Sequence, residues 1–208
     1  VRDYGCDSLR LYELFVGPPE LDSEWDDRGI DGVNRFLKRL WNLLMDSKEA
    51  NVEATKEMVK LRHKLVYDIT SRLETFSLNT VISGFMEYNN KFIDLAKKTG
   101  GIDKETLETI AVLLSPFAPH FAEEMWEQLG HTETIFKAGW PVYDETEMAD
   151  DEIEVPVQIN GKTRAVISIP ADASKEDAIA AGKEAVADKL TGTIVKEIYV
   201  PKKIINIV

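Results

Sequence analysis

The sequence predicts a mainly α protein, in which an antiparallel helical bundle is followed by a small α+β domain of β-β-α-β-β order. Two changes of pattern along the 208 residues support this fold class. Apolar residues recur every three or four positions through most of residues 30–130, which indicates amphipathic helices. From Glu154 onwards they alternate, which indicates strands. Seven acidic residues lie between 144 and 154, and we interpret 144–153 as a linker.

The first elements lead into the bundle. Residues 1–28 are expected to form a separate segment with a short helix at 8–16 and a loop at Gly17-Pro18-Pro19. The bundle itself is expected over 29–143. Its first long helix is predicted from an apolar stripe made of Ile30, Val33, Phe36, Leu37, Leu40, Trp41 and Leu44.

Three further helices follow with short links, which favours antiparallel packing. The second is expected at about 52–75. The third is predicted to start with Asn79 as N-cap and to end at Gly100-Gly101, and the fourth to start after Asp103 as N-cap.

Two prolines interrupt the next apolar stretch. Because proline removes an N–H donor and disfavours a helix before it, one helix should end near 114–115. Another should start at Pro119, since proline is favourable at a first helical position. The sequence therefore predicts a packed corner between two helices at Pro116 and Pro119.

The small domain is expected over 154–208. We predict a three-residue loop at 159–161 that pairs Val157 with Thr163, because a two-residue Asn-Gly turn would pair Val157 with Arg164. Ser174 is a predicted N-cap for an alanine-rich helix that reaches about Leu190. Two more strands are expected at 194–200 and 204–208.

The net charge of −12 argues against a dedicated nucleic-acid-binding domain, because phosphate binding depends on Lys and Arg. The charge is nevertheless segmental: residues 28–41 contain four basic residues and one acid. Two basic surfaces are candidates for RNA contact, and a merely solvated face is the alternative for each. Their residues are Arg35, Lys38, Arg39 and Asn42 in the first long helix, and Lys162, Arg164, Lys202 and Lys203 in the small domain.

The sequence offers little for catalysis. It has no Gly-rich phosphate loop, no nucleophile elbow and no ligand spacing for zinc, so we predict no catalytic, cofactor or metal site within it. The single cysteine, Cys6, fits a reducing compartment, and we expect the cytoplasm. No apolar run approaches the length of a membrane span, so no membrane partner is expected.

Several stretches resemble one family. They are Tyr4–Tyr12 (YGCDSLRLY), Gly29–Leu44, Pro116–Gly130 with Trp140-Pro141, Val155–Arg164 and the Pro170–Ala173 turn. The first stretch looks like the segment that follows the catalytic Lys-Met-Ser-Lys-Ser loop in the bacterial leucyl-tRNA synthetase family. Gly29–Leu44 and Pro116–Gly130 with Trp140-Pro141 are similar to helices of the anticodon-binding domain of class I aminoacyl-tRNA synthetases of the leucine, valine, isoleucine and methionine group. The last two stretches resemble the C-terminal domain of the bacterial leucyl-tRNA synthetase family. Together, these stretches extend the resemblance over essentially the whole chain.

The resemblance implies a tRNA-binding portion of an enzyme that attaches leucine to tRNA-Leu with ATP and Mg. It implies that the catalytic domain, a partner in the same chain, lies upstream, and we expect Val1 to fall in mid-frame of a longer, monomeric protein. It also implies phosphate and shape contacts rather than reading of anticodon bases. Two alternatives stay open: a non-catalytic helical scaffold for protein–protein interaction and a free-standing tRNA-binding cofactor.

Overall fold

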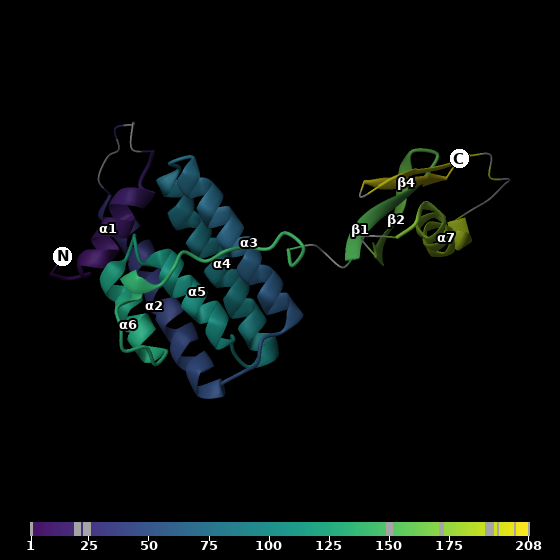
Figure 1. Ribbon diagram of the computed structural model, residues 1–208. Helices are drawn as coiled ribbons and strands as arrows, with labels where there is room; N and C mark the ends of the chain where they lie inside the picture. Colours follow the sequence, from purple (N-terminus) through teal and green to yellow (C-terminus); the bar gives the residue numbers. More distant parts are fainter. Residues whose placement is uncertain are drawn as a thin grey trace. The chain divides into compact units, whose positions relative to one another are not determined.

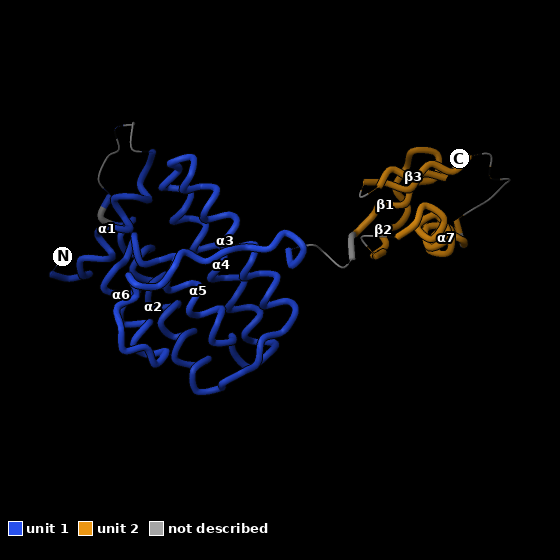
Figure 2. Tube along the Cα trace, viewed as in Figure 1, with its two compact units in different colours: residues 1–148 blue, residues 149–208 orange. Residues whose placement is uncertain are grey.

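The computed structural model describes residues 2–18, 22, 26–148, 152–170, 173–189, 194, 196–201 and 203–207. The chain divides into two compact units, a helical unit at 1–148 and a small unit at 149–208 (Figure 2). No helix in the described ranges combines the length and the apolar character that crossing a bilayer requires.

The helical unit confirms the predicted bundle (Figure 1). Its elements are α1 (Cys6–Phe15), α2 (Asp27–Ala50), α3 (Lys56–Glu74), α4 (Leu78–Thr99), α5 (Lys104–Leu114), α6 (Pro119–Gln128) and the 3₁₀ helix η1 (Ile135–Lys137). Leu11 and Tyr12 of α1 are buried with the bundle residues, so α1 belongs to the same core as α2–α6.

Local sequence signals determine several helix ends. Asp103 accepts a hydrogen bond from the N–H of Thr106 at 3.0 Å, as expected of the N-cap of α5. Gly100 ends α4 with φ of 86°, a left-handed conformation that glycine adopts without steric cost. Pro119 is the first residue of α6, which confirms the predicted corner.

The predicted N-cap at Asn79 is wrong, because the N-cap of α4 is Ser77, two residues earlier. Phe76 takes a left-handed φ of 54° at the end of α3. The N–H of Phe76 then reaches the carbonyl of Leu73, and that of Ser77 reaches Arg72, each at 2.9 Å. This pattern closes α3 in the manner of a Schellman motif and leaves no room for a longer link.

After η1 an extended segment crosses the surface of α3. The Trp140 indole N–H donates to Thr70 Oγ1 at 3.0 Å, and the ring of Tyr143 meets that of Tyr67 edge-on at 5.1 Å. The backbone N–H of Asp144 donates to Nδ1 of His63 at 3.0 Å. His63 therefore helps to hold this segment on α3.

The small unit has the predicted β-β-α-β-β order. Its elements are β1 (Glu152–Ile159), β2 (Lys162–Pro170), α7 (Lys175–Ala185), the 3₁₀ helix η2 (Ala187–Lys189), β3 (Glu197–Val200) and β4 (Ile204–Ile207). The sheet order is β2-β1-β4-β3, and β1 pairs with β4 in parallel. Ser174 caps α7 as predicted, although α7 ends five residues before Leu190.

The predicted hairpin loop is wrong. The connection is the two-residue Asn160-Gly161 turn, with φ of 50° and 77°, and Ile159 pairs with Lys162. The register then shifts between Val157 and Gln158, so that Val157 pairs with Ala165. A β-bulge at Arg164 thus removes the Val157–Arg164 pairing that had argued against the short turn.

Candidate nucleic-acid interface

The exposed side of α2 carries the first candidate surface. The helix buries Val33, Leu40 and Leu44, and this apolar face turns the polar residues toward solvent. All four predicted residues of α2 are exposed, and the spacing of three and four places Arg35, Lys38 and Arg39 on one face. In the described part of the chain, none of these three cations forms an ion pair or hydrogen bond.

Two neighbouring cations, Arg28 and Lys97, are each paired with an aspartate and are therefore less available to a ligand. Arg28, which also contributes to the basic stretch, is held by Asp26, with Nε 3.1 Å from Oδ1. The Asp26 carboxyl has its pKa lowered by its hydrogen bonds with the Arg28 side chain and backbone. On α4, Lys97 bonds Asp94 at 2.7 Å and is the main cause that lowers the pKa of that carboxyl, with a smaller contribution from Arg39. The remaining basic face is therefore made of Arg35, Lys38 and Arg39.

Beside this face lies a groove between α1, α2 and α6, which we call the α2 groove. Its volume is about 580 Å³. It is lined by Tyr4, Gly5, Cys6, Asp7, Ser8, Asn34, Leu37, Lys38, Trp41, Asn42, His120 and Phe121. Two predicted contact residues, Lys38 and Asn42, thus belong to a concave site that the periodicity of α2 alone does not reveal.

The α2 groove is held in shape by a clamp between α1 and the proline corner. The backbone N–H of Phe121 donates to Oδ2 of Asp7 at 2.7 Å, and Nδ1 of His120 lies 2.9 Å from Oδ1. Asp7 is buried, and it satisfies one of the unpaired N–H groups at the start of α6 from more than 100 residues away. Arg10 adds hydrogen bonds to the carbonyls of Pro116 and Phe117 at 3.2 and 3.3 Å.

This clamp changes the interpretation of the proline corner. Phe117 and Met125 pack in the core as expected, and Phe121 meets Trp41 edge-on with ring centres 5.9 Å apart. His120 bonds Asp7 and lines the α2 groove. The corner therefore forms one wall of the candidate site.

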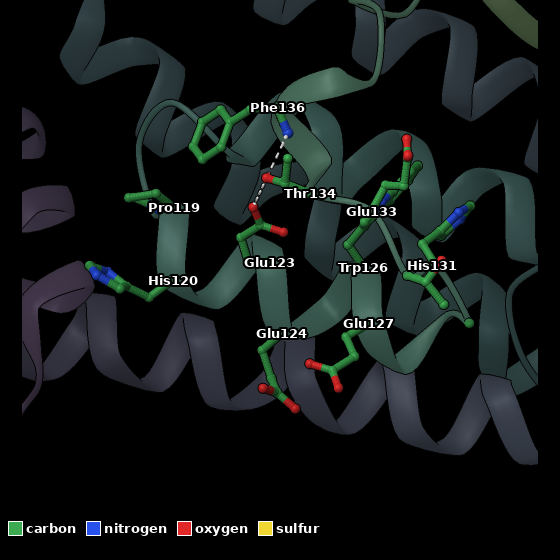
Figure 3. Close-up of a pocket in the computed structure, with 12 residues that line it drawn as sticks. Pro119, His120, Glu123, Glu124, Trp126, Glu127, His131, Glu133, Thr134 and Phe136 are labelled. Carbon is green, nitrogen blue, oxygen red and sulfur yellow. Dashed lines mark hydrogen bonds between the residues drawn. The ribbon is translucent and has the colours of Figure 1, made fainter.

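A second cleft on α6 has the opposite charge. It measures about 860 Å³, and Figure 3 shows Glu123, Glu124, Glu127 and Glu133 around it. Glu123 accepts hydrogen bonds from the Thr134 hydroxyl and from the N–H of Ile135, the latter at 3.1 Å. Among the residues that the structure describes, no Lys or Arg lines this cleft, so it does not suit a polyanion.

The small unit does not gather its four predicted residues into one patch. Lys162 and Arg164 are exposed at the start of the edge strand β2. Lys203 precedes β4, whose far end pairs with Ile159 beside the turn, so Lys203 and the turn lie about 13 Å apart along the strand. Lys203 and the turn are separated because β1 and β4 are parallel, so the end of β1 and the start of β4 lie at opposite ends of the pair. Lys202 lies outside the described residues.

The structure places a different lysine beside Arg164. Lys189 of η2 is exposed, and its Nζ donates to the backbone carbonyl of Arg164 at 3.2 Å. Sequence reasoning missed Lys189 because it lies at the end of the alanine-rich stretch with no signal of its own. The basic surface of the small unit is therefore Lys162, Arg164 and Lys189.

Comparisons with known proteins place the chain among tRNA ligases. The family model for the anticodon-binding domain of tRNA ligase matches residues 55–179, which is more than half of the chain. The chain therefore belongs to this family. The matched range leaves out α1 and α2, and includes Lys162 and Arg164.

The similar proteins are leucine–tRNA ligases. The chain is 45% identical to that of Fervidobacterium nodosum, with 100% of this chain and 28% of the relative covered. For Chlorobaculum parvum the identity is 43%, with 98% and 26% covered. The chain thus spans about a quarter of the length of these relatives.

A solved structure shares the fold over the whole chain. It is the crystal structure of the ternary complex of Agrobacterium radiobacter K84 agnB2 LeuRS-tRNA-LeuAMS, which matches with a TM-score of 0.80 and 26% sequence identity. The match covers 100% of this chain and 29% of that one.

Proposed function

We propose that this chain is the tRNA-binding part of a leucine–tRNA ligase that attaches leucine to tRNA-Leu with ATP and Mg. In this proposal the chain itself performs no catalysis, and the catalytic domain belongs to the same polypeptide. The proposal includes a monomer in the cytoplasm, which the single cysteine supports. The leucine–tRNA ligase relatives support the choice of amino acid.

One observation carries the proposal: Arg35, Lys38 and Arg39 are exposed on one face of α2 without ion-pair partners in the described part of the chain. Surface cations of helices commonly pair with acids three or four residues away. A row of unpaired cations in a chain of net charge −12 is suited to phosphate groups, whose contacts release counterions. This supports backbone and shape recognition of tRNA.

The test is binding of a tRNA-Leu transcript by the 208-residue chain, measured by fluorescence anisotropy between 50 and 300 mM salt. We expect the triple variant Arg35→Ala, Lys38→Ala, Arg39→Ala to bind about 100-fold more weakly at 0.1 M salt. The slope of log K against log salt should fall by about 3, because each lost phosphate contact removes about one released ion.

A matched control removes the same charge elsewhere. Lys56, Lys98 and Lys175 are exposed residues of α3, α4 and α7, and their triple Ala variant should retain the wild-type slope. Equal losses in both variants would indicate a general charge effect, and no loss in the α2 variant would remove α2 from the interface.

The scaffold alternative makes a different prediction. A protein–protein scaffold shows no tRNA binding even at low salt, and that result would contradict the proposal. A free-standing tRNA-binding cofactor binds tRNA as well, but its gene has a start codon at Val1. The reading frame upstream of Val1 therefore separates such a cofactor from the proposed part of a ligase. For the ligase we expect that frame to encode the Lys-Met-Ser-Lys-Ser loop.

A further inference from the structure

The α2 groove has the size and the walls of a site for one planar ring system. Its volume of about 580 Å³ lies within the range of small-ligand sites. Leu37, Trp41 and Phe121 form its apolar surface, and Tyr4 lies at its edge with 36% of its surface exposed. Aromatic side chains of this kind provide stacking surfaces for bases.

The groove also presents hydrogen-bond donors that the protein does not use. Lys38 and Asn42 are exposed, and their side chains make no hydrogen bond in the described part of the chain. The same is true of the indole N–H of Trp41. By contrast, the Asn34 amide donates to Ser8 Oγ at 3.1 Å. The unused donors are suited to the edge of a base and to its phosphate.

The charge of the groove favours an anion. Asp7 is the one acid among the described residues of its lining, and both oxygens of that carboxylate are occupied, by the Phe121 N–H and by His120. Only 9% of the Asp7 side chain is exposed. The acidic cleft on α6 shows the contrast, because four glutamates line it and no described Lys or Arg does.

We propose that the α2 groove holds one unstacked nucleotide of the tRNA, with its base against Trp41 and its phosphate at Lys38. The inference rests on the proposed function and adds a base contact to an interface otherwise made of phosphate contacts. The groove adjoins the basic face of α2 through Lys38 and Asn42, so a tRNA on that face passes its mouth.

Cys6 provides the test because it is the single cysteine of the chain, is exposed and lines the groove. We expect alkylation of Cys6 by N-ethylmaleimide to fill the groove and to weaken binding of the tRNA-Leu transcript about tenfold. The salt slope should fall by no more than about 1, because at most the one phosphate at Lys38 is displaced with the base. Cys6→Ser given the same treatment should bind like the untreated chain.

A substitution tests the same site without alkylation. Asn42→Ala should weaken binding several-fold with an unchanged salt slope, because it removes a donor to the base. Asn90→Ala is the control, since Asn90 is an exposed asparagine of α4 outside the groove. Bound tRNA should also slow the alkylation of Cys6.

Two results overturn the inference, and they are distinguishable. If the alkylated chain and Asn42→Ala bind tRNA as tightly as wild type, the groove holds no nucleotide while the proposed function stands. If the unmodified chain binds no tRNA at low salt, the proposed function fails and the inference fails with it. A protein segment as the natural occupant gives the first result.

Discussion

The helical unit and the small unit differ in how much of their stability can come from buried side chains. Among the described residues, the core of the helical unit contains 32 buried apolar side chains, whereas that of the small unit contains seven. A core of seven residues in a unit of about 60 is near the lower limit for independent folding. Among the described residues, the buried polar side chains, such as those of Asp7 and Arg62, all belong to the helical unit.

The difference extends to the candidate contact residues. Arg35 and Lys38 project from the middle of a 24-residue helix packed on a large core, which fixes their spacing. Lys162 and Arg164 lie at a two-residue turn and a bulge on an edge strand, where local geometry sets their direction. The helical unit thus offers the more rigid surface for recognition.

The same substitution in each core tests this comparison most strongly. Ile82 in the helical unit and Ile205 in the small unit are both fully buried. Each Ile→Ala variant should lose about 2–5 kcal/mol. We expect Ile82→Ala to leave the helical unit folded at 25 °C and Ile205→Ala to unfold the small unit, as measured by hydrogen exchange in peptides from each unit.

Tryptophan fluorescence provides an independent measure for the helical unit, because all four tryptophans precede residue 149. Urea unfolding followed by fluorescence should therefore shift in Ile82→Ala and not in Ile205→Ala. A shift in both variants would show that the two units unfold together and would contradict the comparison.

The clamp at Asp7 should give the next largest effect. Asp7→Ala leaves the N–H of Phe121 and the ring of His120 without their acceptor, at a cost of about 2–3 kcal/mol in urea unfolding. Asp94→Ala is the matched control, because the Asp94–Lys97 pair is 70% exposed on both sides and should contribute less than about 1 kcal/mol. Equal effects would mean that the clamp is no stronger than a surface ion pair.

The contrast between these two aspartates shows what sequence reasoning can reach. Signals that act within a few residues predicted the structure well: Asp103 and Ser174 cap their helices, and Gly100 and Pro119 mark an end and a start. The apolar stripe of α2 also placed its basic residues on the exposed face. These features depend on the periodicity and chemistry of one element.

The failures involve contacts between elements. The link between Asp7 and Phe121 spans 114 residues, so no local pattern reveals the α2 groove. The bulge at Arg164 restores the pairing of apolar residues after a short turn, a compensation that strict alternation does not include. Lys189 reaches Arg164 only because α7 packs on the sheet next to β2.

A buried tyrosine tests the helical core by pH. Burial raises the pKa of the Tyr88 phenol, and its 2.6 Å hydrogen bond to Asp68 adds to this. Because the folded state favours the neutral phenol, its contribution to stability is complete below the unfolded pKa of about 10 and is lost as pH rises above it. Wild type should lose up to about 1.4 kcal/mol per pH unit above 10 through this group.

Tyr88→Phe lacks this group, so its stability relative to wild type should improve between pH 9 and pH 11. The control is Tyr67→Phe, since Tyr67 is 41% exposed and its ring lies at the surface of α3. Urea unfolding by fluorescence at each pH measures the difference. A constant difference between wild type and Tyr88→Phe over this range would contradict the prediction.

The smallest effect compares two glycines with open space around them. An added Cβ meets nothing within 4 Å at Gly161 or at Gly32, but only Gly161 has a positive φ, of 77°. Gly161→Ala should therefore destabilise the small unit by about 1 kcal/mol, whereas Gly32→Ala in α2 should stabilise the helical unit by roughly 0.5–1 kcal/mol. Hydrogen exchange resolved by unit measures both. Stability changes of opposite sign would show that Gly161 is required by the turn, whereas Gly32 only lowers the helix propensity of α2. Changes of the same sign would contradict this distinction.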